Sequence, residues 1–169
     1  SGRALLCVSD IAPVLALDGA GWLIGDLFPR HGAPERIEGF MKIEIANPIA
    51  DDAEGLLTRF WGNYVGVFSR GDAWTVLRAP LGMLPVLYSR SRDWTALASD
   101  AQALTDIRLL KPEIDWVEVA RTHYLRDLPS TSTGLARLSE LLAGSELSLS
   151  PNGEIVLRER WSPWHFASP

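Results

Sequence analysis

The sequence is short of cysteine, of long apolar runs and of basic leader-like segments, and each shortage excludes a class of protein. A single cysteine, Cys7, cannot form an internal disulfide. No stretch reaches the ~18 consecutive apolar residues that a membrane-spanning helix needs. Nothing at the amino end combines a basic region with a sustained apolar run, as a secretory signal would. These absences predict a cytoplasmic protein that is not inserted in a membrane.

Excess positive charge is also missing. The formal net charge is -5, and acidic and basic residues are interspersed along the chain. Neutralising a phosphate backbone requires a sustained positive field. We therefore do not expect nucleic acid as a partner.

What the sequence does have is enough apolar material for one core. Hydrophobic residues make up 47% of the 169 residues. This length lies within the roughly 100–200 residues of a typical domain, which can bury a sizeable core. We expect a single domain over residues 1–169.

Short apolar runs separated by turn residues predict a chain made mostly of strands. The expected strands are residues 4–8, 14–17, 22–24, 41–46, 64–68, 73–77, 85–88, 94–98, 146–149 and 154–157. The four strands between residues 64 and 98 are expected to form one antiparallel meander. Asn152 and Gly153 tolerate the positive φ angles of a tight turn and predict the last hairpin.

Three helices are expected among these strands. Asp51 and Asp52 can cap the first, whose apolar side would extend to Trp61. The second covers residues 100–105, and Asp115 opens the third. Four residues of the third helix share one face: Trp116, Val117, Ala120 and Tyr124. Helices segregated from strands, rather than alternating with them, predict an α+β layered domain.

Residues 60–103 carry three phrases that resemble the glutaminase domain of asparagine synthetases. The family phrases are "L-x-G-x-F-A-F-A-x-x-D", "R-D-x-x-G-x-x-P-L-Y" and "x-F-A-S-E-x-K-A-L". The residues that fill them, in order, are Gly62, Tyr64, Val65 and Phe68, then Arg78, Gly82, Pro85 and Tyr88, then Ala98, Ser99, Ala101 and Leu104. Further on, residues 140–144 and Trp161 are similar to the family's "E-L-x-P-G-x-x-L" and closing "Y-W". The resemblance covers residues 55–164.

Two details are closer to one branch, the lasso-peptide cyclases of bacterial peptide-modifying clusters. The segment GDLFPR at residues 25–30 is similar to an early "G-x-L-F-x-R" phrase of that branch. The segments RFWGNYV at residues 59–65 and RAPLGMLP at residues 78–85 are similar to its "F-W-G-x-Y-V" and "R-D-P-x-G-x-x-P". The branch implies a macrolactam synthetase.

This resemblance implies a fold and a division of labour. The fold would be a four-layer αββα sandwich of the Ntn-hydrolase type, with two antiparallel sheets face to face. ATP and magnesium would be bound by a synthetase domain that follows residue 169, because the glycine-rich phosphate loop "S-G-G-x-D-S" does not occur here. That domain would activate an Asp or Glu side chain of a precursor peptide, and a partner maturation protein could assist. No cofactor is expected in residues 1–169.

The family's own glutaminase chemistry lacks its residues in this chain. The nucleophile of that site is an amino-terminal cysteine, whereas this chain begins Ser1-Gly2. The glutamine-holding phrases "N-G-E-I-Y-N" and "G-S-D" have no counterpart between residues 30 and 60. Cys7 lies in an apolar run, where a thiol is usually a small buried hydrophobe. We therefore expect no catalytic residue, and keep a glutaminase or amidohydrolase that uses Ser1 as the alternative.

The other polar residues have simpler interpretations. The three histidines, His31, His123 and His165, have no ligands at metal spacing. The acids at residues 51, 52 and 54 suit a helix start, and the charges at residues 158–160 suit a solvated strand end. The candidate contacts to the synthetase domain are Trp161, Trp164, Arg78 and Tyr88.

Overall fold

A computed structural model describes residues 13–17, 21–33, 35–37, 53–125, 128, 130–165 and 167. It has an α+β architecture with two antiparallel sheets and few helices. The chain divides into two compact units: residues 1–84 with 143–169, and residues 85–142. Each unit is described separately. The strands expected at residues 4–8 and 41–46 lie outside the described residues, and a single domain over residues 1–169 stays a prediction.

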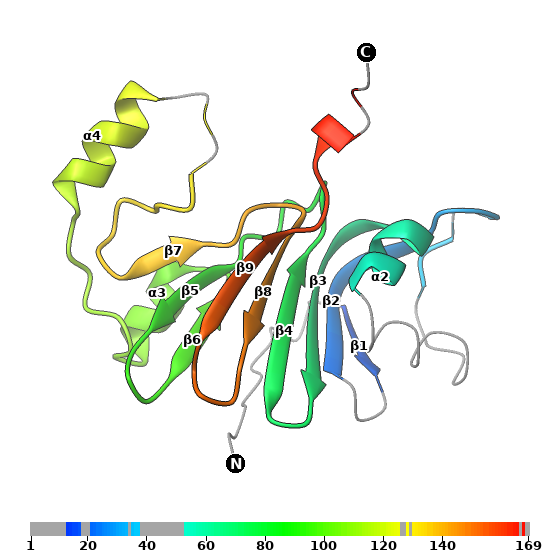
Figure 1. The fold of residues 1–169 in the computed structure, drawn as a ribbon, viewed down its shortest axis with the longest axis horizontal. Helices are drawn as coiled ribbons and strands as arrows, with labels where there is room; N and C mark the ends of the chain where they lie inside the picture. Colours follow the sequence, from blue (N-terminus) through cyan, green and yellow to red (C-terminus); the bar gives the residue numbers. More distant parts are fainter. Residues whose placement is uncertain are drawn as a thin grey trace. The chain divides into compact units, whose positions relative to one another are not determined.

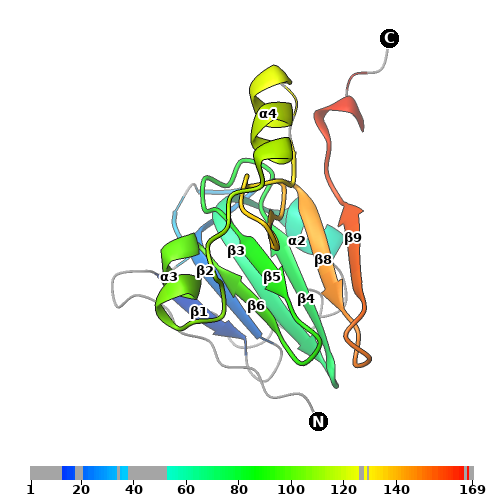
Figure 2. The ribbon, with the colours of Figure 1, turned by 90° about the vertical axis from the view of Figure 1, so that its left-hand side faces the viewer.

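The first unit is built on a six-stranded sheet with the order β1-β2-β3-β4-β8-β9 (Figures 1 and 2). Its elements are β1 (Val14–Leu17), β2 (Gly21–Pro29), α2 (Ala53–Arg59), β3 (Phe60–Arg70), β4 (Ala73–Arg78), β8 (Ser145–Leu149), β9 (Ile155–Glu159) and the short 3-10 helix η1 (Pro163–His165). Every neighbouring pair is antiparallel. The two hairpins expected around residues 69–72 and 150–153 are confirmed as β3–β4 and β8–β9.

The second unit contains a three-stranded sheet with the order β6-β5-β7. Its elements are β5 (Leu87–Arg90), β6 (Thr95–Ala98), α3 (Ala101–Asp106), α4 (Trp116–Tyr124) and β7 (Leu138–Glu140). Asp100 caps α3 by accepting from the Gln102 N–H, and Asp115 caps α4 by accepting from two N–H groups. Both expected helices are therefore confirmed, within a residue at each boundary.

The predicted four-strand meander is wrong. β3 and β4 belong to the six-stranded sheet, whereas β5 and β6 belong to the three-stranded one. The segment between β4 and β5 contains Pro80, Gly82 and Pro85, which interrupt regular pairing. The outer edge of β4 pairs instead with β8, and the pairing runs from Trp74 opposite Leu149 to Leu77 opposite Glu146.

The first predicted helix ends earlier than expected. α2 stops at Arg59, and Phe60 and Trp61 already belong to β3, where they pair with Pro29 and Phe28 of β2. Both aromatic residues fit the helical spacing, but pairing with β2 fixes them in extended conformation. This places Phe60 in the core and leaves Trp61 exposed.

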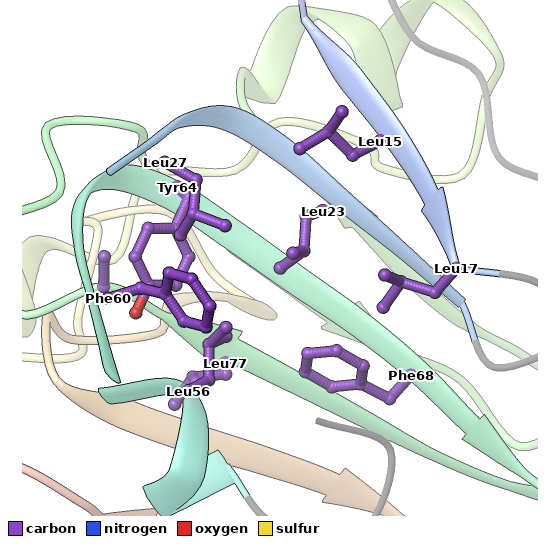
Figure 3. Close-up of a cluster of buried hydrophobic side chains, with 10 residues drawn as sticks. Leu15, Leu17, Leu23, Leu27, Leu56, Phe60, Tyr64, Phe68 and Leu77 are labelled. Atoms are coloured by element: carbon purple, nitrogen blue, oxygen red, sulfur yellow. The ribbon is translucent and has the colours of Figure 1, made fainter. Parts of the chain in front are cut away.

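One face of the six-stranded sheet carries the main core. Register places Leu15 opposite Leu23 and Leu77 opposite Gly66, and Figure 3 shows these leucines with Tyr64, Phe68 and Leu56 of α2. Each fully buried leucine contributes roughly 1.5–3 kcal/mol. The second unit has its own smaller cluster around Leu104, Leu110 and Leu138.

Candidate functional site

Three of the phrases that carry the resemblance meet at one end of the six-stranded sheet. Residues 25–29 of β2 pair with residues 60–64 of β3, and Arg78 at the end of β4 pairs with Val65. The Trp61 indole stacks on Phe28, with ring centroids 4.7 Å apart, and its N–H donates to the carbonyl of residue 29 at 3.1 Å. Segments far apart in the sequence thus form one surface, and we take it as the candidate site.

Asn63 ties the third phrase to this surface. Its side-chain oxygen accepts the backbone N–H groups of Met83 at 2.7 Å and Leu84 at 3.0 Å. The Ala79 N–H donates to the Tyr64 carbonyl at 3.0 Å, so the loop after β4 is held at both ends. Met83 nevertheless points its side chain into solvent. A loop with a fixed backbone and an exposed apolar side chain is preorganised for contact, because little conformational entropy remains to be lost.

Two glycines allow β2 and β3 to approach each other here. Gly25 and Gly62 have φ angles of 106° and 142°, which side-chain-bearing residues rarely adopt. A Cβ on Gly25 would lie 2.2 Å from the Asn63 carbonyl oxygen, and one on Gly62 would lie 2.1 Å from that of Asp26. These residues begin the GDLFPR phrase and centre the RFWGNYV phrase, so both phrases have a structural reason for their glycine.

Asp26 and Arg36 form a surface ion pair at this end, where two exposed arginines also lie. Arg30 donates to the Thr58 carbonyl at 3.5 Å, and the Arg59 guanidinium lies 5.7 Å from the centroid of the Phe60 ring. Arg36 donates to the Asp26 carboxylate at 3.1 Å, and both side chains are roughly half exposed. Such an exposed pair contributes little to stability, typically about 0.2–1 kcal/mol. The side chains that the structure places here are aromatic, apolar, amide and cationic, and aromatic residues and arginine are enriched at protein interfaces.

The four candidate contact residues take different places. Arg78 is buried in β4, and its carbonyl accepts the Gly144 N–H at 3.1 Å. Tyr88 is half-buried in β5 of the second unit. The backbone N–H of Trp161 donates to the Gly144 carbonyl at 3.0 Å, which fixes the segment that leads to η1. Trp164 in η1 is 81% exposed. That these residues meet a neighbouring domain stays a prediction.

A buried carboxylate was missed by sequence reasoning. Glu146 accepts from Arg160 at 2.8 and 3.2 Å and from the Ser148 hydroxyl at 2.9 Å, and Arg158 lies 3.6 Å away. The interpretation of residues 158–160 as a solvated strand end is therefore wrong for Arg160, whereas Arg158 and Glu159 are exposed as expected. The hairpin turn at Asn152 and Gly153 already sets Glu146 opposite Arg158, and counting back from that turn would have found the pair.

The Tyr64 hydroxyl is the other buried polar group of interest. Figure 3 shows Tyr64 within the buried apolar cluster beside Phe60, and its hydroxyl has no hydrogen-bond partner among the described residues. Burial raises the pKa of this phenol well above its ordinary value, because the apolar surroundings penalise the charged form. Tyr64 is therefore neutral at physiological pH and acts as a core residue.

The remaining candidates lie apart from this surface or outside the described residues. Ser1, Cys7, Asp51 and Asp52 are outside them. His31 and His123 are exposed. Among the residues that the structure covers, no three His, Cys, Asp or Glu side chains gather as a metal site would require. None of the described helices has both the length and the apolarity to cross a bilayer.

Comparison with known proteins leaves the resemblance to be judged on the phrases and their geometry. No family model and no curated protein matches this sequence.

Proposed function

We propose that this chain is the non-catalytic, glutamine-amidotransferase-like scaffold domain of an ATP-dependent, asparagine-synthetase-like amide-forming enzyme. The enzyme is a lasso-peptide macrolactam cyclase. The domain supports the synthetase domain that follows it and helps to hold the precursor peptide or a partner maturation protein.

The convergence of the three phrases at one end of the six-stranded sheet carries this proposal. β2 pairs with β3 and β3 with β4, so the three phrases lie side by side in one sheet. Here residues 25–30, 59–65 and 78–85 are linked by Trp61, Asn63 and the two close-approach glycines. Trp61, Gly25 and Gly62 are residues that the phrases specify, whereas Asn63 stands at a position that the phrase leaves open.

The finer architecture belongs to the same proposal. The two antiparallel sheets stack as the inner layers of an αββα sandwich, with helices outside. The apolar side chains on the second face of the six-stranded sheet support this stacking: Trp22 and Trp74 lie with rings parallel and centroids 6.0 Å apart on that face. An experimental structure in which the sheets pack in another way would contradict this part.

A cyclase does not require glutaminase chemistry. The synthetase domain binds ATP and magnesium and adenylates a carboxyl side chain of the peptide, and the amino group of the peptide itself displaces AMP. Ammonia from glutamine has no part in such a reaction, so a sandwich without nucleophile or glutamine-binding phrases can persist as a platform. Trp164, exposed beyond the last strand, is suited to contact the synthetase domain.

The test uses the full-length protein with a precursor peptide, ATP and magnesium. We expect the peptide to lose one water, as measured by mass spectrometry, with release of AMP and pyrophosphate and without glutamine. A peptide in which the acceptor carboxyl is replaced by an amide serves as the control and should not react.

The alternative, a glutaminase or amidohydrolase that uses Ser1, predicts another outcome. Incubation with glutamine would then release ammonia, and Ser1→Ala would abolish the release. Glutamine turnover that depends on Ser1, together with no cyclisation, would overturn the proposed function.

A further inference from the structure

Strand β9 forms one outer edge of the six-stranded sheet. Its five residues pair with β8 on one side, and no described strand lies on the other side (Figure 2). Leu157, in the middle of the strand, is 43% exposed. An edge strand presents a row of unpaired backbone N–H and C=O groups, with which a strand of another molecule can pair. An edge of this kind is a hazard unless something obstructs it.

A β-bulge ends the ladder between β8 and β9. Ser145 pairs with Glu159, and beyond this pair the backbone N–H groups of Arg160 and Trp161 both donate to the Gly144 carbonyl, at 2.9 and 3.0 Å. Two residues after β9 thus stand opposite one residue before β8, which is the pattern of a bulge. The crossing is close, because a Cβ on Gly144 would lie 2.6 Å from the Trp161 carbonyl oxygen. The regular edge that is open to another strand is therefore limited to β9 itself.

Charged side chains lie over the same end of this edge. Glu146 of β8 is opposite Arg158 of β9, and the Glu146 side chain is only 4% exposed. Arg160 donates to the Glu146 carboxylate at 2.8 Å, and the Arg158 guanidinium lies 3.6 Å from it. The Arg158 side chain nevertheless remains 55% exposed, so water still solvates much of it. The edge strand thus carries a charge that is directed inward over the sheet, which is one of the ways in which natural sheets discourage strand addition.

We propose that the bulge, together with the cluster of Glu146, Arg158 and Arg160, forms a barrier that prevents the β9 edge from pairing with strands of other molecules. A strand added beside β9 would place its side chains against Arg158 and remove water from the guanidinium. The Glu146 carboxylate is shared with Arg160 and cannot compensate fully for that loss. A second copy of β9, placed antiparallel beside the first, would set both Arg158 side chains on the same face, where like charges destabilise pairing.

Stability alone does not explain a buried carboxylate at this place. Glu146 also lies opposite Leu77 of β4, which is fully buried, so an apolar residue would suit the position. Replacing a buried ion cluster by apolar residues of similar volume is often neutral or stabilising. The cluster therefore has the properties of a feature that limits association, with little net gain for the fold of the single chain.

The first test replaces the whole cluster in one apolar variant that carries Glu146→Leu, Arg158→Val and Arg160→Leu. We expect this variant to fold, because it leaves no charge buried without its partner. Sedimentation velocity over a concentration series should show it shifting to dimers and larger species relative to the parent at the same concentration. Adding Leu157→Lys to the apolar variant should reverse the shift, because a lysine on an edge strand discourages pairing.

Arg158→Val alone keeps the proposal testable if the apolar variant fails to fold. This change retains the ion pair between Glu146 and Arg160 and removes a side chain that is more than half exposed. Its circular dichroism and urea unfolding should resemble those of the parent, whereas its sedimentation should shift in the same direction as that of the apolar variant. The matched control carries Asp26→Leu and Arg36→Leu, which remove an ion pair at β2, a strand that lies between β1 and β3. The control should sediment as the parent does.

Three results would each overturn the proposal. The first is an Arg158→Val variant that folds and sediments as the parent does. The second is association that Leu157→Lys does not reverse, because another surface would then be responsible. The third is an equal shift in the control, because loss of any surface ion pair would then suffice. These outcomes are independent of the proposed function, since none of the measurements involves ATP, peptide or a synthetase domain.

Discussion

The side-chain oxygen of Asn63 accepts the backbone N–H of Met83 at 2.7 Å, and in doing so it fixes a loop that no strand pairing holds. The same oxygen accepts the next N–H along the chain, that of Leu84. One amide in β3 thus replaces the two backbone partners that a regular sheet would have supplied. The surface that carries the proposed function depends on these two hydrogen bonds to the Asn63 side chain.

Asn63→Ala removes both hydrogen bonds and leaves two N–H groups without their acceptor. We expect the free energy of unfolding to fall by about 1–3 kcal/mol. Hydrogen exchange at Met83 and Leu84 should accelerate more than at Val76, which lies in the paired part of β4. Asn63→Asp retains an acceptor and should preserve most of the protection. Unchanged exchange in Asn63→Ala would contradict the role assigned to this side chain.

Gly62→Ala tests the close approach of β2 and β3. The added Cβ would lie 2.1 Å from the Asp26 carbonyl oxygen at a φ of 142°. Relief requires the strands to separate, so we expect a loss of about 3 kcal/mol or more. Gly71→Ala is the matched control: it also has a positive φ, 61°, but nothing lies within 4 Å of its Cβ position, and it should lose only about 1 kcal/mol. Chemical denaturation measures both, and equal losses would contradict the steric explanation.

Arg160→Ala removes the main partner of the buried Glu146 carboxylate. We expect a loss of about 2–3 kcal/mol, because a buried charge then loses two of its charge-assisted hydrogen bonds. Arg158 is 3.6 Å from the same carboxylate and its side chain is more than half exposed, so Arg158→Ala should lose less than about 1 kcal/mol. Urea denaturation of the two variants would reveal the difference. A larger loss for Arg158→Ala than for Arg160→Ala would show that Arg158, and not Arg160, is the main partner of Glu146.

Tyr64→Phe should be neutral or stabilising by up to about 1 kcal/mol at pH 7, because the hydroxyl that it removes is buried without a partner among the described residues. Alkaline pH should separate the two proteins further. The folded state keeps the phenol proton above the ordinary tyrosine pKa of about 10, whereas the unfolded state loses it. The unfolded state then binds fewer protons, so the stability of the parent falls with rising pH.

The Tyr64→Phe variant should lack the part of this alkaline fall in unfolding free energy that is due to the Tyr64 phenol. The measurement is the difference in unfolding free energy between parent and variant at pH 9 and at pH 11. The variant should gain relative to the parent by up to about 1.4 kcal/mol per pH unit above 10. A difference that does not change with pH would show that Tyr64 ionises freely in the folded protein.

Trp164→Ala should leave the isolated domain within about 0.5 kcal/mol of the parent, because the side chain is 81% exposed. Trp74→Ala is the contrasting change: Trp74 stacks on Trp22 in the sheet, and its loss should cost about 2 kcal/mol or more. In the full-length enzyme of the proposed function, Trp164→Ala should speed limited proteolysis between this domain and the proposed synthetase domain. Proteolysis at the parental rate would contradict a role for Trp164 in the proposed interdomain contact.

Local signals in the sequence predicted the elements whose partners are near in the chain. The hairpin at Asn152 and Gly153 and the aspartate caps of α3 and α4 are such signals, since the groups that interact lie within a few residues of one another. Trp61 shows the limit of this reasoning. Its spacing suits a helix, and only its pairing with Phe28 of β2 places it in a strand.

The candidate site was harder to predict because its bonds join distant segments. The resemblance paired RFWGNYV with RAPLGMLP, but nothing local indicates that Asn63 accepts two N–H groups of the second phrase. The adjacency of β4 and β8 was missed for the same reason, since either edge of an alternating strand can accept a partner. The exposure of Trp116, Val117 and Tyr124 on α4 was also not predicted, because helical periodicity identifies an apolar face but not whether a neighbouring element covers it.

The order of strands in the six-stranded sheet has a consequence for synthesis on the ribosome. β8 lies directly beside β4, yet the whole of residues 85–142 is made between them. The outer edge of β4 therefore emerges with its backbone groups unpaired and must wait for residues 145–149. An open edge of this kind can recruit strands from neighbouring chains, so the nascent protein is exposed to such pairing until residues 145–149 have been made and have joined β4.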